Sequence, residues 1–141
     1  VGKAELRREG RSGLLLLAFG TMLAPAERMA ERLDATVVNM RFVKPLDAAL
    51  IVELANRARA VVTLEENVVA GGAGAAVAEL LATSGLAMPL LQIGIPDRFI
   101  EHGSREDCLR EAGLDLASVS SRVEQWWGRQ VVSRTLKAAA V

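Results

Sequence analysis

Short apolar runs alternate with longer amphipathic stretches along the whole chain. The apolar or β-branched runs that predict buried strands are residues 14–19, 35–42, 60–64 and 89–93. The stretches whose apolar positions recur at helical spacing are residues 21–33, 48–58, 73–84, 104–112 and 116–127. Strands that alternate with helices in this way are typical of a parallel sheet covered by helices on both faces.

Polar residues and glycines mark several of the expected helix boundaries. Thr21, Asp47 and Ser104 each precede a helical stretch and can accept a hydrogen bond from its free backbone amides. Gly85 and Gly113 follow helical stretches, where a residue without Cβ most easily ends the helix. These boundaries fit short connections between strands and crossover helices.

The two ends of the chain complete the expected architecture. Residues 3–9 carry alternating charges that suit an exposed edge strand, and residues 65–71 are expected to form a loop. We therefore predict one α/β domain over residues 1–127, a three-layer sandwich with a mostly parallel five-stranded sheet. Residues 128–141 have no clear stop signal and are expected to form a frayed C-terminal tail.

Composition and charge narrow the class of protein. With 141 residues, 51% hydrophobic and 24% charged, the chain is the size of one globular domain and has too much apolar surface for a disordered chain. The 17 basic and 17 acidic residues cancel, and an acidic middle lies between basic ends. This distribution, with 4% aromatic residues, argues against a nucleic-acid groove. No run reaches the roughly 18 apolar residues of a membrane span, and no secretory signal is recognisable, so a cytoplasmic location is expected.

The sequence offers few residues for catalysis. A single Cys and a single His exclude a disulfide framework and a His-rich metal site within this chain. His102 is the one possible general base, although a histidine before glycine and a helix cap more often binds backbone in a turn. Cys108 lies in the middle of a predicted helix without a neighbouring cation to activate its thiol.

Polar residues gather where the predicted strands end. Arg41 is expected to pair with Glu65 or Glu66, although it could instead hold a carboxylate or phosphate. Gly72 and Gly74 resemble part of a dinucleotide-binding turn, but the two carboxylates upstream would repel a pyrophosphate, so close helix packing is the preferred explanation. We interpret these polar residues as a structural or interface cluster: Arg41, Lys44, Asp47, Glu65, Glu66, Asn67, Asp97 and His102.

Four motifs together resemble one enzyme family. Residues 41–47 read Arg-Phe-Val-Lys-Pro-Leu-Asp, residues 62–67 read Val-Thr-Leu-Glu-Glu-Asn, residues 71–74 read Gly-Gly-Ala-Gly, and residues 96–103 read Pro-Asp-Arg-Phe-Ile-Glu-His-Gly. They resemble the C-terminal domain of the 1-deoxy-D-xylulose-5-phosphate synthases, and the resemblance spans about residues 2–126. The first and last motifs are specific to that family. One departure is Asn39, which stands where an Asp is usual.

The resemblance implies a role as one part of a larger enzyme. Members are three-domain homodimers that use thiamine diphosphate and Mg²⁺ to condense pyruvate with D-glyceraldehyde 3-phosphate, releasing CO₂, for isoprenoid, thiamine and pyridoxal synthesis. In that family the diphosphate and metal sit on the first domain, and the second supplies the glutamate that activates the cofactor. This chain is therefore expected to bind neither, to supply no catalytic residue and to be inactive alone. Its partners would be those two domains. Alternatives are the equivalent domain of a transketolase or 2-oxo-acid dehydrogenase β-subunit, or a stand-alone interaction or regulatory ligand-binding module.

Overall fold

A five-stranded sheet forms the centre of the molecule. The computed structural model describes residues 1–140, and its strands are β1 (Glu5–Arg8), β2 (Leu14–Ala18), β3 (Thr36–Asn39), β4 (Ala60–Val68) and β5 (Leu90–Ile95). Their order across the sheet is β1-β3-β2-β4-β5, with β2 to β5 parallel to one another and β1 antiparallel to β3. The mostly parallel sheet predicted from the sequence, including the charged edge strand, is confirmed.

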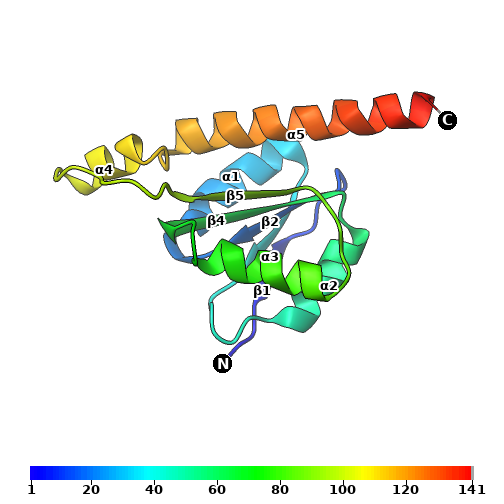
Figure 1. The fold of residues 1–141 in the computed structure, drawn as a ribbon, viewed down its shortest axis with the longest axis horizontal. Helices are drawn as coiled ribbons and strands as arrows, with labels where there is room; N and C mark the ends of the chain where they lie inside the picture. Colours follow the sequence, from blue (N-terminus) through cyan, green and yellow to red (C-terminus); the bar gives the residue numbers. More distant parts are fainter. Residues whose placement is uncertain (141) are drawn as a thin grey trace.

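Helices cover both faces of this sheet (Figure 1). They are α1 (Leu23–Leu33), α2 (Ala48–Arg57), α3 (Ala73–Thr83), α4 (Arg105–Glu111) and α5 (Leu116–Ala139), preceded by a short 3₁₀ turn at Gly20–Met22. Helices α1 and α5 pack on one face, and α2 and α3 on the other. The three-layer α/β sandwich is therefore confirmed, and no described helix is long and apolar enough to cross a bilayer.

Strand β2 shows why a continuous apolar run becomes a central strand. Leu14, Leu16 and Ala18 point into the core beneath α1 and α5, whereas Leu15 and Leu17 point into the core beneath α2 and α3. All five are at most 1% exposed. Since side chains alternate between the faces of a strand, only a strand covered on both sides can bury such a run. Each buried leucine stabilises the fold by about 1.5–3 kcal/mol.

Some boundaries differ from those predicted. Thr21 lies within the 3₁₀ turn and does not cap α1, which begins after Met22 without a side-chain cap. Strand β3 ends at Asn39, and shortly after it Arg41 has φ 58°, a left-handed conformation that a strand cannot continue through. Residues 65–68, expected in a loop, extend β4, which pairs again with β5 beyond an irregularity in the register.

The C-terminal helix is longer than expected. Helix α5 was predicted to end at about residue 127, yet it continues to Ala139 and extends past the end of the sheet (Figure 1). The prediction of a frayed tail is therefore wrong for residues 128–139, because Gly128 costs a helix only about 1 kcal/mol and no proline follows it; Val141 lies outside the described residues. Whether the domain ends at residue 127 stays a prediction.

Candidate functional site

Glu65 is the centre of the polar structure at the carboxyl end of β4. Its side chain is fully buried, and both carboxylate oxygens accept backbone hydrogen bonds from the first turn of α3. The Ala73 amide donates to Oε2 at 2.7 Å, and the Gly74 amide donates to Oε1 at 2.8 Å. A helix N-terminus favours an anion because its free amides and its dipole point toward it. Here the chain supplies that anion itself, and Glu65 takes the place of a cap for α3.

The glycines around this carboxylate are needed because nothing larger fits. A Cβ on Gly72 would lie 2.3 Å from the Val68 carbonyl oxygen and 2.6 Å from Glu65 Oε2. A Cβ on Gly74 would lie 2.5 Å from Thr63 Oγ1. The expectation that these glycines allow close packing of helix on sheet is therefore confirmed.

A second buried carboxylate, that of Asp47, connects the start of α2 to the N-terminal segment. Its buried carboxylate accepts hydrogen bonds from the Ala4 amide at 3.1 Å and the Leu50 amide at 3.4 Å, and Lys3 Nζ lies 3.7 Å away. The Ala4 hydrogen bond is the main reason that the pKa of Asp47 lies below its ordinary value, and the Leu50 amide and Lys3 add to the effect. The predicted cap of α2 is confirmed, and the same side chain fastens the start of the chain.

Arg41 does not make the ion pair expected of it. Its side chain is exposed, and its guanidinium carbon lies 5.7 Å from the centre of the Phe42 ring. Glu65 binds the α3 amides instead, and Glu66 pairs with Arg105 at 2.6 Å. The predicted pairing was wrong. Strand β3 ends at Asn39, before Arg41, and the two carboxylates bind partners on α3 and α4, the helices that follow β4 and β5.

The other predicted residues make no such contacts. Within residues 1–140, no hydrogen bond or ion pair joins the exposed side chains of Lys44, Asn67, Asp97 and His102 to another group. Asp47, Glu65 and Glu66 thus serve three separate contacts rather than one cluster. An interface role for the exposed residues stays a prediction.

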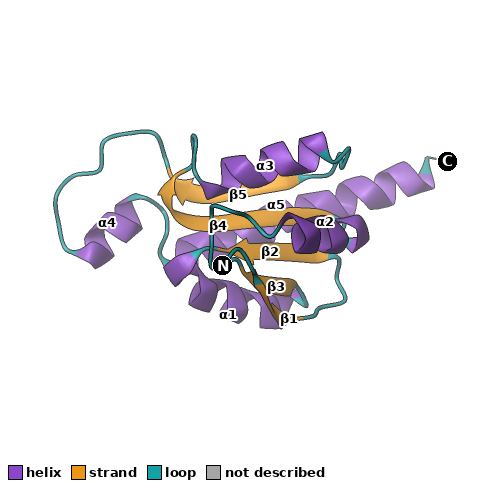
Figure 2. Ribbon diagram, turned by 90° about the horizontal axis from the view of Figure 1, so that it is seen from below, coloured by secondary structure: helices purple, strands orange, loops and turns teal. Residues whose placement is uncertain are grey.

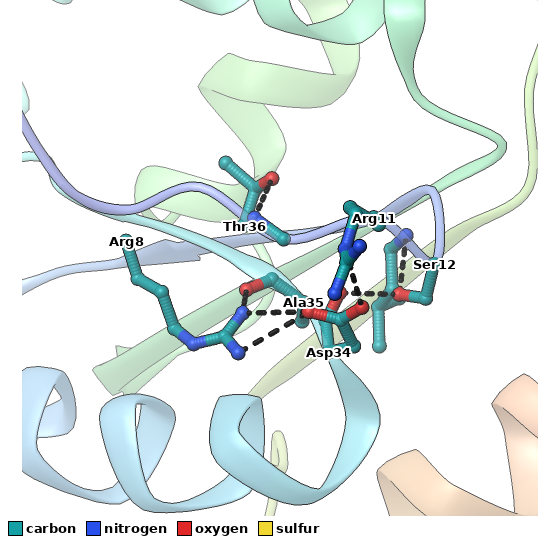
Figure 3. A network of polar contacts seen from close by, with 8 residues as sticks. Arg8, Arg11, Ser12, Asp34, Ala35 and Thr36 are labelled. Carbon is teal, nitrogen blue, oxygen red and sulfur yellow. Dashed lines mark hydrogen bonds and ion pairs between the residues drawn. The ribbon is translucent and has the colours of Figure 1, made fainter.

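A network around Asp34 was not anticipated from the sequence (Figure 3). Arg8 donates to Asp34 Oδ1 at 3.2 Å and to the Ala35 carbonyl at 2.8 Å, and the Ser12 hydroxyl donates to the Asp34 carbonyl at 2.9 Å. Asp34 ends α1 in the left-handed conformation, with φ 47°. The network fastens the segment around β1 to the turn between α1 and β3. Its only signal in the sequence was the mixed charge of that segment.

The sequence of this domain matches a known family. Residues 2–119 match the family model described as transketolase, C-terminal domain. The chain belongs to that family. As a transketolase C-terminal domain, it has 64% identity over 127 residues to 1-deoxy-D-xylulose-5-phosphate synthase of Thioalkalivibrio sulfidiphilus, covering 87% of this chain and 20% of that protein.

Two further relatives bear the same name. The synthase of Nitrosococcus oceani is 54% identical over 129 residues, covering 92% of this chain and 20% of its own length. That of Xanthomonas euvesicatoria is 50% identical over 142 residues, covering 99% of this chain and 22% of its own length, so its match includes the C-terminal end of α5. The chain therefore spans about a fifth of the length of these relatives.

Solved structures share the fold of this transketolase C-terminal domain. A split-gene transketolase, described as an inactive beta4 tetramer, matches with a TM-score of 0.77 and 35% identity. The match covers 88% of this chain and 42% of that one. Transketolase from Campylobacter jejuni matches with a TM-score of 0.56 and 18% identity over 88% of this chain and 18% of that one, which supports the fold alone.

The cofactor implied by the family does not fit the residues of this chain. A diphosphate would seek the glycine-rich N-terminus of α3, yet the Glu65 carboxylate already binds those amides and would repel a second anion. Among residues 1–140 no three His, Cys, Asp or Glu side chains gather as ligands for Mg²⁺.

Proposed function

We propose that this chain is the C-terminal domain of a 1-deoxy-D-xylulose-5-phosphate synthase. The whole enzyme would use thiamine diphosphate and Mg²⁺, bound elsewhere, to condense pyruvate with D-glyceraldehyde 3-phosphate and release CO₂. The observation that carries the proposal is the 64% identity over 127 residues to a synthase of that name. The split-gene transketolase is less similar, at 35% identity, so the synthase is preferred over a transketolase.

Within that enzyme we assign the domain a structural role in assembly, and the isolated chain is inactive. The polar groups that sequence reasoning singled out support this role. Glu65 and Asp47 are buried and bind the chain's own backbone, so their carboxylates fix α3, α2 and the N-terminal segment rather than facing a substrate. The partners of the domain would be the preceding domains of the same homodimeric enzyme, in the cytoplasm.

A chimaera tests this function. The matching C-terminal fifth of the Thioalkalivibrio synthase is replaced by this chain, and formation of 1-deoxy-D-xylulose 5-phosphate is measured. We expect activity within about tenfold of the parent, because the two sequences are 64% identical over 127 residues. The control is the same synthase lacking its C-terminal fifth, which should lose at least a hundredfold. A chimaera as inactive as that truncated enzyme would contradict the proposal.

A further inference from the structure

The end of the sheet at which the parallel strands terminate, which we call its carboxyl edge, carries large apolar side chains that the domain itself leaves uncovered. Val43 follows β3, Val68 ends β4 and Phe99 follows β5, and their exposed fractions are 37%, 40% and 82%. Because β3, β4 and β5 are parallel, their carboxyl ends meet at the same edge. Partners and ligands of open α/β sheets bind at this edge.

Phe99 lies on a projecting segment, residues 96–104, which we call the β5–α4 arm. Figure 2 shows the arm leaving the end of β5 and swinging away from the sheet before it returns to α4. Under the arm is a cavity of about 340 Å³, and part of its wall is apolar, formed by Ile95, Leu109, Ala112 and Leu114. An aromatic ring in solvent beside an apolar hollow is the pattern of an interaction surface.

The arm is held in place on both sides of the exposed ring. Before Phe99, Arg98 donates to the Glu111 carbonyl and to its Oε1, the latter at 3.3 Å. After Phe99, the Cys108 thiol lies 3.6 Å from the Glu101 carbonyl oxygen as a weak donor. A loop fixed in this way loses little conformational entropy when it binds, which favours a permanent contact.

The start of the chain lies at the same edge. Strand β1 runs antiparallel to β3, and Glu5 at its beginning pairs with Asn39 at the carboxyl end of β3. Asp47 holds Lys3 and Ala4 there. Polypeptide preceding Val1 would therefore enter at the edge that exposes Val43, Val68 and Phe99. The relatives are about five times as long as the chain, which matches their C-terminal region, so their remaining length precedes it.

We propose that the carboxyl edge of the sheet, with the β5–α4 arm as its anchor, docks onto the preceding part of the same polypeptide. This inference rests on the proposed function, since it takes the missing partner from the synthase relatives. Phe99 inserts into an apolar site on the upstream domains, and Val43 and Val68 lie at the border of the contact. The far end of α5, at the opposite end of the molecule, stays outside it (Figure 1).

Hydrogen–deuterium exchange and the Phe99→Asp substitution test the docking in the chimaera. We expect residues 96–104 to exchange at least tenfold more slowly in the chimaera than in the isolated chain. Phe99→Asp should abolish that protection and lower the melting temperature of the chimaera by several degrees, while Phe99→Leu retains most of both. In the isolated chain Phe99→Asp should leave the melting temperature unchanged, because the ring is 82% exposed. Leu136→Asp, at 65% exposure on the far end of α5, is the matched control and should change neither.

The outcomes separate the two proposals. An active chimaera whose arm exchanges as fast as in the isolated chain would overturn the docking and keep the function. An inactive chimaera with a protected arm would refute the function and support the docking. Protection that appears in the isolated chain as its concentration rises would assign the arm to a second copy and overturn the proposal.

Discussion

Replacing Glu65 by leucine is expected to lower the free energy of unfolding by about 3–5 kcal/mol. The substitution removes the acceptor of the Ala73 and Gly74 amides, two donors that are buried at the start of α3. Neither amide can reach water without opening the contact between α3 and the sheet, so both lose their hydrogen bonds in the folded state. Glu65→Gln keeps one acceptor oxygen and should cost about half as much.

Urea denaturation followed by circular dichroism measures this loss. Glu66 is the matched control because it is the next residue of β4 but only partly buried, and its partner Arg105 is exposed. Glu66→Gln should change stability by less than about 1 kcal/mol. If Glu65→Leu proved as mild as this control, the carboxylate would not be the cap of α3, and its position would be free for another anion.

The substitution Gly72→Ala should destabilise the domain by about 3 kcal/mol, whereas Gly128→Ala should stabilise it. At Gly72 the new Cβ meets the Val68 carbonyl and the Glu65 carboxylate, so backbone must shift and the cap is displaced. At Gly128, within α5, the Cβ meets nothing within 4 Å. Alanine there gains about 0.5–1 kcal/mol from helix propensity alone.

Thermal unfolding of the two alanine variants compares these effects directly, since the substitution is identical and only the surroundings differ. Variants with the same melting temperature would show that α3 can move away from β4 without loss. That result would contradict the tight packing on which the assignment of the glycines depends.

The architecture could be predicted from the sequence because the burial of a strand or helix face requires a regular pattern of apolar residues along the chain. An apolar run such as that of β2 fits only a strand with both faces covered, and Asp47 and Ser104 cap the helices that follow them, as expected. The end of β4 was predicted wrongly because it depends on contacts between residues distant in sequence. Strand β4 continues past Leu64 to Val68, where it pairs again with Ile95 of β5, and the Glu65 carboxylate on this stretch binds two amides of α3.

The partners of the polar side chains were harder to predict than the elements that carry them. Arg41 and the carboxylates of β4 all lie near strand ends, and opposite charge suggested a pair. In the structure Arg41 has a left-handed backbone and pairs with neither carboxylate, and no local signal marked Arg41 for that conformation. The Asp34 network depends on a similar left-handed residue at the end of α1. Such side-chain networks follow from backbone turns that are specified by the whole fold.

Isothermal titration of the 141-residue chain with thiamine diphosphate in the presence of Mg²⁺ tests most directly whether the domain is structural. We expect no saturable heat and no product from pyruvate and D-glyceraldehyde 3-phosphate, because Glu65 binds the α3 amides that a diphosphate would need. Saturable binding with a micromolar Kd would contradict this expectation and place cofactor chemistry within this chain.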